Sequence, residues 1–467
     1  MSDASQTTAP TRLQRQVLAV AIVASFMAIL DSFVVSLALP AIGRELGGGL
    51  RVQQWVVDAY LLTLGALILA AGSLSDHFGR ARVLQWGLGG FALTSVLCGA
   101  AWTGEILVVS RGLQGVAGAL LVPSSLALIV SHFDSAAQGS AIGKWSAWTS
   151  AAAIVAPLIG GVSVDLLSWR VIFFVNVLPA AAIWPVLARL RKADDATSPA
   201  GIDIAGALLA VVALGGPVYG LIEQGSAGWG SPQVWLPLAA GLVATVLFLI
   251  HESRTAAPLL PLRMFTVRNF GWGNIATAAI YGGFSLGFFA LGIYIQQVGG
   301  MKATTAGLAL LPSTVILMLL ASFFGGLAGK YGPRWFMTAG PVLCAAGFLL
   351  TLSVGGSLNY WTQILPGQVV FGLGLSMTVA PLTAAILGSV PEKQAGVGSA
   401  VNNAVSRIAG LVCIAFAGFI VGPELTTAGL HRALLATAAL LLLGGVCSAV
   451  GIRNPLPASP ANPASPR

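Results

Sequence analysis

The sequence predicts an all-α polytopic membrane protein with about fourteen transmembrane helices: two six-helix halves and a two-helix hairpin inserted between them. Three observations predict this fold. The 467 residues are 56% hydrophobic and only 8% charged, whereas a soluble domain is about 25% charged. Apolar runs of about 18 or more residues, long enough to cross a hydrocarbon core of roughly 30 Å, recur along the chain. One sequence pattern also occurs twice, once in each half.

Breaks at Gly, Pro and charge clusters define the expected spans. We place them near residues 17–39, 52–74, 83–101, 105–130, 140–163, 169–190, 202–222, 233–250, 269–296, 303–329, 334–354, 361–388, 399–421 and 430–452. We therefore expect a cytoplasmic N-terminal tail, an N-terminal six-helix bundle, a linker with the inserted hairpin, a C-terminal six-helix bundle and a disordered cytoplasmic tail, over residues 1–16, 17–190, 191–268, 269–452 and 453–467.

The repeated pattern is G-x-L-x4-G-x-x in the loops that follow spans 2 and 10. It reads "GSLSDHFGRARVL" from residue 72 and "GGLAGKYGPRWFM" from residue 325, an offset of 253 residues. A looser echo relates residues 115–129 to 372–386. Repeated halves around a central site are the architecture of alternating-access transporters, and a channel does not need them.

Charge placement predicts the topology and excludes several classes of function. Most of the 23 Lys and Arg residues fall in loops on one side, so the positive-inside rule places both termini in the cytoplasm. The basic residues form no stripe that would suit nucleic acid. The polar N-terminus lacks a cleavage site for a signal peptide. The four Cys and four His residues have no metal-ligand or disulfide spacing, so we expect neither a metal site nor a disulfide.

Three ionisable residues of the N-terminal half fall inside apolar runs. At about 1.5 Å per residue, Asp31 lies roughly 12 Å, and Asp58 and Arg111 each about 9 Å, from the outer ends of their spans. An isolated charge there costs on the order of 2.5 to 3.5 kcal/mol. These residues are therefore expected to face a cavity or to pair. Arg407, in the C-terminal half, has no acid at a similar depth, and a gating or structural role is favoured for it over substrate contact.

Several motifs resemble those of one transporter family. "LDSFVVSLALP" at 30–40 is similar to a span 1 signature, "RGLQGVAGAL" at 111–120 to a span 4 motif, "APLIGG" at 156–161 to a span 5 motif and "SWRVIFFVNVLP" at 168–179 to the start of span 6. With the loop at 72–83, they resemble the major facilitator superfamily, in its fourteen-helix drug:proton antiporter branch. The chain departs from this pattern at Phe33 and Ser36, and Gly329 replaces Asp76 in the second loop copy.

The resemblance implies an antiporter driven by the proton gradient, without a cofactor. No G-x4-G-K-[ST] loop is present, so ATP hydrolysis is not the expected energy source, and no enzyme chemistry is visible. The loop 2-3 motif is expected to form a cytoplasmic latch between the halves, in which one glycine permits close helix approach and the other a tight turn: Gly72, Asp76, Gly79, Arg80 and Arg82. The alternative is that its arginines only set topology.

The span 5 motif, Pro157 with Gly160 and Gly161, removes one helical hydrogen bond and lets backbones touch, so we expect a bend or pivot there. Ordinary packing of small residues is the competing explanation.

We hypothesise that Asp31 is the main proton and substrate-cation site, that Asp58 is a second acid and that Arg111 tunes both. Burial favours an uncharged carboxyl and a nearby arginine favours a charged one, so one acid of the set could exchange a proton near neutral pH. The alternative is a permanent Asp31–Arg111 bridge that locks the helices together.

Aromatic and amide side chains are candidates for the lining of a substrate cavity, since they suit flat, lipophilic compounds. For each aromatic residue alone, core packing is the competing explanation. The candidates are Trp55, Tyr60, Gln114, Trp148, Phe284, Phe288, Tyr294, Gln296, Gln297, Asn402, Asn403 and Arg407.

Together these patterns predict a plasma-membrane exporter of lipophilic, cationic or zwitterionic drugs or antibiotics, acting as a monomer in contact with membrane lipid. Two alternatives stay open. One is the export of a single metabolite or self-made antibiotic, and the other is a transport-inactive receptor or scaffold.

Overall fold

The computed structural model describes residues 11–191, 203–255, 258–355, 357–391, 394–422 and 424–454. These residues form helices and connecting turns, and no β-strand occurs among them. The expected tails at 1–16 and 453–467 fall mostly outside this part of the chain. Helix α1 begins at Arg12, so it already includes the last residues of the expected N-terminal tail.

The N-terminal helices match the first six predicted spans. Span 5 is built from three short helices and one π-helical turn, and span 6 from two helices. The elements are α1 (Arg12–Leu46), α2 (Gly49–Phe78), α3 (Arg80–Gly99), α4 (Gly104–His132), α5 (Ser135–Ser150), α6 (Ala152–Ala156), the π-turn η1 (Pro157–Gly161), α7 (Val162–Leu166), α8 (Val171–Phe174) and α9 (Val177–Leu190).

The remaining helices match spans 7 to 14. They are α10 (Ile204–Ala227), α11 (Pro232–Arg254), η3 (Leu262–Thr266), α12 (Arg268–Gln297), α13 (Ala303–Tyr331), α14 (Pro333–Leu350), η4 (Thr351–Ser353), η5 (Tyr360–Ile364), α15 (Leu365–Leu387), α16 (Ala395–Ala415), α17 (Ala417–Val421) and α18 (Thr427–Gly451).

Thirteen spans in the described residues are long and apolar enough to cross a membrane. Helix α3 is not among them, although it coincides with the predicted span 83–101. Arg80, Arg82 and Gln85 at its start lower its mean hydropathy. The chain is thus a multi-pass membrane protein, and the count of fourteen stays a prediction.

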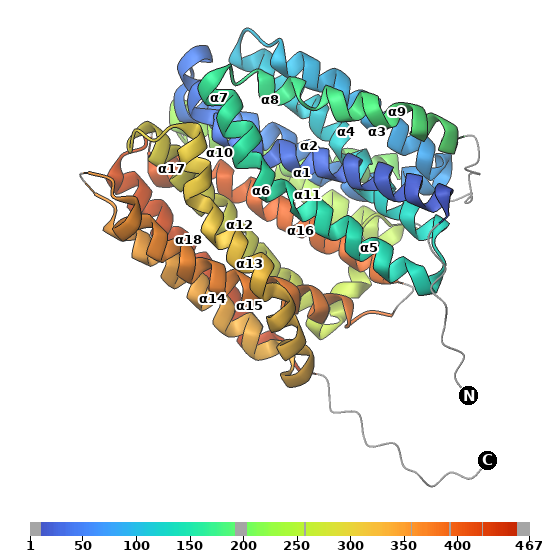
Figure 1. Cartoon of the computed structure of the whole chain (residues 1–467). Helices are drawn as coiled ribbons and strands as arrows, with labels where there is room; N and C mark the ends of the chain where they lie inside the picture. Colours follow the sequence, from blue (N-terminus) through green and yellow to red (C-terminus); the bar gives the residue numbers. More distant parts are fainter. Residues whose placement is uncertain are drawn as a thin grey trace, which may run out of the picture.

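Two sets of helices pack mainly within themselves. Helices α1 to α9 contact one another, and so do α12 to α18 (Figure 1). The sets meet mainly along two seams: α2 packs against α16, and α13 packs against α6, η1 and α7. Helix α1 also contacts α12 and α13 between these seams. The α2–α16 seam and the α13 seam are therefore the places where the sets could separate.

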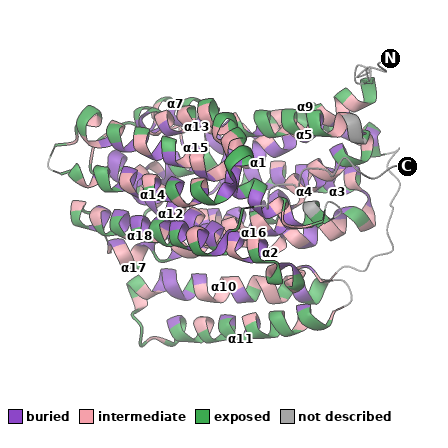
Figure 2. Cartoon of the chain, turned by 90° about the horizontal axis from the view of Figure 1, so that it is seen from below, coloured by how far each residue is buried: buried purple, intermediate pink, exposed green. Residues whose placement is uncertain are grey.

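The inserted hairpin lies against the α2–α16 seam. Helix α10 packs on α2, α16 and α17, and α11 packs on α10. Figure 2 shows α10 beside α2 and α16, with α11 largely exposed at the edge of the molecule. At one end, the Glu223 carboxylate of α10 accepts hydrogen bonds from Arg51 and from the indole of Trp55, at 2.9 Å each. Trp55, predicted to line a cavity, therefore helps to fix the hairpin.

Left-handed glycines end corresponding helices of the two sets. Gly79 (φ +93°) separates α2 from α3, and Gly332 (φ +87°) separates α13 from α14. These two residues are 253 positions apart, the offset of the sequence repeat. L side chains rarely adopt such φ values, which explains why both loop copies keep glycine at this position.

Candidate functional site

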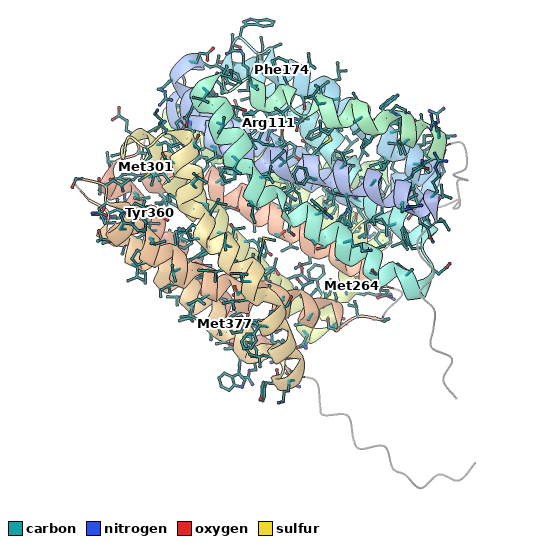
Figure 3. All side chains as sticks on the ribbon, viewed as in Figure 1. Arg111, Phe174, Met264, Met301, Tyr360 and Met377 are labelled. Atoms are coloured by element: carbon teal, nitrogen blue, oxygen red, sulfur yellow. The ribbon has the colours of Figure 1, made fainter. Side chains whose placement is uncertain are left out.

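The predicted N-terminal charges Asp31 and Arg111 form a buried ion pair. The Arg111 Nη1 atom donates to Asp31 Oδ2 at 2.5 Å, and both residues are at most 2% exposed. Asp31 lies on α1 and Arg111 on α4, so the pair joins two helices far apart in sequence. Figure 3 places Arg111 among the N-terminal helices.

Neutral donors complete the surroundings of Asp31. Its Oδ1 atom accepts from the amides of Gln114 at 3.1 Å and Asn176 at 3.0 Å. Gln114 in turn donates to the hydroxyl of Ser95 at 2.9 Å and accepts from Arg111 at 2.7 Å. We call Asp31, Ser95, Arg111, Gln114 and Asn176 the Asp31 cluster. Each member is at most 2% exposed, so the cluster is a closed network in which the Asp31 charge is already neutralised by Arg111.

Sequence reasoning missed Ser95 and Asn176. Asn176 lies within the motif at 168–179, which was noted for its resemblance and not for this residue. Gln114 was predicted to line the cavity, and it is fully buried instead. Its position three residues after Arg111 is the signal that places both side chains on one face of α4.

Arg111 is also held by α2. Its Nε atom donates to the carbonyl of Val56 at 3.0 Å, and its guanidinium lies 4.3 Å from the centre of the Tyr60 ring. Tyr60 is 1% exposed, and its hydroxyl donates to the carbonyl of Ala28 in α1. Tyr60 therefore packs beneath the ion pair. The cavity role predicted for it does not fit this burial.

Asp58, the second predicted acid, lies outside this cluster. It is fully buried on α2, and neither carboxylate oxygen has a hydrogen-bond partner among the residues that the structure describes. It is close enough to Cys413 of α16 to interact with it electrostatically. The sequence placed Asp31, Asp58 and Arg111 in one layer, and the structure joins only Asp31 and Arg111.

Arg407 lies near the middle of the span Gly396–Val421, on the same seam. Its Nε atom is buried without a partner, and its guanidinium forms neither an ion pair nor a hydrogen bond in the part of the chain that the structure describes. A Cβ added at Gly65 of α2 would lie 3.9 Å from Arg407 Cβ. Arg407 also interacts electrostatically with Tyr60 and Tyr281.

The predicted aromatic residues of α12 mostly pack in the core. Phe284 and Phe288 lie 5.2 and 5.1 Å, between ring centres, from Phe371 of α15. Phe284 is buried, whereas Phe288 is partly exposed. The hydroxyl of Tyr294 is 2.8 Å from that of Thr427. Core packing, the competing explanation, accounts for Phe284 and Tyr294.

The predicted amides divide in a similar way. The Asn402 amide donates to Asn274 and Thr277 of α12, at 3.2 and 2.8 Å, so it joins two helices. Gln296 is buried and donates to the carbonyl of Gly292. The three remaining candidates, Trp148, Gln297 and Asn403, are exposed.

The loop 2-3 motif forms a local contact in this conformation. Asp76 pairs with Arg80 one turn along the chain, at 3.8 Å, and Arg82 is exposed. A Cβ added at Gly72 would meet no atom within 4 Å. The close helix approach expected at Gly72 is therefore wrong for this conformation, because no neighbouring helix reaches it. Gly79, by contrast, makes the expected turn.

The span 5 motif lies against α13. Its residues Pro157 to Gly161 form the π-helical turn, and a Cβ added at Gly161 would lie 2.7 Å from the backbone nitrogen of Thr304. Just beyond, Asp165 accepts from the backbone nitrogens of Ala303 and Thr304 at 2.9 Å each. A carboxylate of one helix set thus caps the first turn of a helix in the other.

The α2–α16 seam is closed at the same end. The Gln54 amide donates to the carbonyls of Ile414 and Ala415, at 2.7 and 3.1 Å. At the opposite end, α5 and α13 diverge (Figure 1), and α5 is not among the main neighbours of α13. The end with Gln54 and Asp165, which the topology predicts to be extracellular, therefore holds the two helix sets together.

The fold and the paired buried charges define a multi-pass membrane transporter. The sequence profile described as the Major Facilitator Superfamily matches residues 21–413 and, in a second match, 273–467. The chain belongs to this superfamily. It is therefore a transporter and not an enzyme.

Several curated relatives are drug or antibiotic resistance proteins. The Methylenomycin A resistance protein of Bacillus subtilis is 34% identical over 403 residues, covering 85% of each chain. The Tetracenomycin C resistance and export protein of Streptomyces glaucescens is 33% identical, covering 84% of this chain and 73% of that protein. The multidrug efflux pump LfrA of Mycolicibacterium smegmatis is 32% identical, covering 89% and 82%.

Solved structures agree on the fold. A POT family transporter in complex with 5-aminolevulinic acid superposes with a TM-score of 0.70 at 11% identity, covering 92% of this chain and 94% of that one. The peptide transporter POT in complex with sulfate gives 0.69 at 17% identity, covering 93% of each. At these identities the likeness concerns the fold alone.

Proposed function

We propose that the chain is a proton-driven antiporter that exports lipophilic, cationic or zwitterionic drugs or antibiotics from the cytoplasm by alternating access. The names of the relatives support drug export. Proton coupling rests chiefly on one observation: Asp58 is fully buried within a membrane span, and both of its carboxylate oxygens lack hydrogen-bond partners.

A proton is the simplest group that Asp58 could bind and release. Burying a charged carboxylate without a partner costs several kcal/mol even after the protein relaxes around it. The surroundings of Asp58 therefore favour the uncharged, protonated carboxyl. If water or substrate reaches Asp58 when the α2–α16 seam opens, the charged form is solvated and the proton leaves. Loss and uptake of a proton are thereby linked to opening of the seam.

The Asp31 cluster is proposed as a fixed part of the N-terminal bundle. Asp31 already accepts three hydrogen bonds, so its charge is satisfied without a substrate. This geometry favours the permanent bridge over Asp31 as the main proton site. Asp58, predicted as the second acid, becomes the stronger candidate for the main proton site.

Alternating access would use the two seams. We propose that bundles 17–190 and 269–452 rock as units, with contacts of Gln54 and Asp165 closing the outer end. The inner end would close when the loop 2-3 motif, residues 72–83, reaches the other bundle. In the described part of the chain, the Asp76 carboxylate pairs with Arg80 of its own motif and with no basic residue of the other bundle, which fits a latch that is open on the inside.

We further propose a plasma-membrane location with both termini cytoplasmic, from the distribution of Lys and Arg. A monomer is sufficient for this mechanism, in contact with membrane lipid through its apolar surface.

The test is dye transport in proteoliposomes with an imposed pH gradient. The native chain is expected to accumulate a fluorescent lipophilic cation only when protons flow the other way. Asp58→Asn is expected to lose at least about 90% of this uphill transport. It is expected to keep the exchange of labelled for unlabelled dye at equal concentrations, because this exchange needs no net proton movement. Asp134→Asn, at an exposed position before α5 and outside the latch, controls for loss of one carboxylate.

Unchanged uphill transport by Asp58→Asn would remove Asp58 from the mechanism. If the native chain itself ignores the pH gradient, proton antiport is wrong.

A second candidate is the export of a single metabolite or self-made antibiotic. The relative named for Tetracenomycin C resistance and export favours it. A resistance profile over chemically unrelated drugs separates the two functions, since a dedicated exporter protects against one compound class.

A further inference from the structure

The charges in the middle of the described spans do not balance. Four charged residues are buried or half-buried away from the span ends: Asp31, Asp58, Arg111 and Arg407. Asp31 and Arg111 neutralise each other at 2.5 Å. Asp58 is fully buried, and we count it as uncharged because its surroundings favour the protonated carboxyl. The remaining charge is the guanidinium of Arg407, so this layer carries a net positive charge.

Asp58 does not neutralise Arg407. Arg407 lies level with Gly65 of α2, seven residues beyond Asp58. At 1.5 Å per residue, this places the two about 10 Å apart along the helix. Neither of them forms an ion pair in the described chain. Intramembrane arginines normally pair with acids or backbone carbonyls, and Arg407 does neither.

Arg407 lies near tyrosine side chains of both helix sets. It interacts with Tyr60 of α2, whose hydroxyl bonds to Ala28 of α1, and with Tyr281 of α12. Asn403, one turn earlier on α16, is exposed on the same face. A polar face in the middle of a span that packs on α2 and α12 is the surface expected of a water-filled path and not of a lipid contact.

Aromatic rings continue from Arg407 along α12. Tyr281 lies 5.7 Å from Phe284 between ring centres, and Phe288 follows one turn further. Tyr281 and Phe288 are both partly exposed. The surface thus offers a cationic group beside flat apolar walls, which suits a lipophilic ring system that carries an acid.

We propose that Arg407 binds an acidic group of the transported compound, so that the substrates are lipophilic acids or zwitterions and not simple cations. This inference rests on the proposed export function and narrows it. It also reverses the role favoured for Arg407 on sequence grounds. Asp31 is buried and already paired with Arg111, whereas Arg407 has vacant donors for an anion.

A matched pair of dyes tests the proposal: a rhodamine with a free carboxyl group and its methyl ester. They share one ring system, and only the first is a zwitterion. Binding to the purified full chain in nanodiscs is measured by fluorescence anisotropy, without any pH gradient. We expect the acid to bind at least about tenfold more tightly than the ester, the ratio typical of one hydrogen-bonded charge pair.

Single substitutions test whether the tighter binding of the acid dye depends on the Arg407 side chain. Arg407→Gln is expected to abolish the difference between the dyes, and Arg407→Lys to keep part of it. Arg254→Gln, which removes an exposed charge at the end of α11, is expected to change nothing. Size-exclusion profiles confirm that each variant is folded.

Three results overturn the proposal: equal binding of the two dyes by the native chain, binding of neither, or a preference that survives Arg407→Gln. A fourth is displacement of the acid dye by millimolar chloride or phosphate, which would make Arg407 an inorganic anion site. Transport of the ester is measured separately. If a pH gradient drives the ester while the acid does not bind, the export function stands and this inference fails.

Discussion

The Asp31 cluster and the α2–α16 seam contain the same kinds of residue, an acid and an arginine, in opposite states. In the cluster, Asp31 and Arg111 satisfy each other, Gln114 bonds to both, and Asn176 donates to Asp31. In the seam, Asp58 and Arg407 have no hydrogen-bond partner for their buried atoms. A satisfied pair holds helices together and resists change. Residues without partners are free to bind and release a proton or a ligand. The comparison therefore assigns a structural role to the Asp31 cluster and a transport role to Asp58 and Arg407.

The largest expected effect follows from breaking the cluster. Arg111→Ala leaves Asp31 charged and buried without its main partner, which typically costs 3 to about 5 kcal/mol. We expect a large loss of folded protein, measured by thermal unfolding and fluorescence size exclusion in detergent.

The double variant Asp31→Leu/Arg111→Met is the informative control for Arg111→Ala. If the pair only holds helices together, replacing it by apolar residues restores much of the lost stability. A double variant as unstable as Arg111→Ala would mean that the cluster needs its charges for more than mutual compensation.

These two regions also show what the sequence could predict. Apolar run length predicted the helices, and the spacing of glycines predicted the turns at Gly79 and Gly332, because both are local properties. The depth of Asp31 and Arg111 suggested that they could meet. Depth could not show that Asp58 points away from them, since the direction of a side chain depends on how helices rotate about their axes.

Partners from distant helices were beyond prediction for the same reason. Asn176 is 145 residues from Asp31, and Asp165 is 138 residues from Ala303. The sequence around Asn176 or Asp165 contains no pattern that indicates a partner in a distant helix. Phe284 and Tyr294 of α12 were overassigned to the cavity, since aromatic content alone does not distinguish packing from ligand contact.

An intermediate effect is expected where the seam opens. Gln54→Ala removes two hydrogen bonds between α2 and the end of α16. Each such bond is worth about 0.5–1.5 kcal/mol, so the population open at the outer end is expected to rise about tenfold. Double electron–electron resonance measures this opening as the distance between spin labels at Trp102 and Glu424. These two exposed positions lie one in each helix set.

Labels at Trp102 and Leu167, both in the N-terminal set, supply the control for Gln54→Ala. Their distance is expected to stay unchanged, because the Asp31 cluster holds that set as one body. A change within the N-terminal set that matches the change across the seam would remove the distinction between a rigid cluster and a movable seam.

The smallest expected effect is the change in unfolding free energy caused by Asp58→Asn. Asp58 has no hydrogen bond to lose, and an amide has nearly the same shape as an uncharged carboxyl. We expect the unfolding free energy to change by less than about 1 kcal/mol, far below the effect of Arg111→Ala. Paired thermal unfolding of the two variants measures the contrast. A loss of several kcal/mol in Asp58→Asn would show that Asp58 is charged and compensated in the resting protein, and its assignment as a proton carrier would then lose its physical basis.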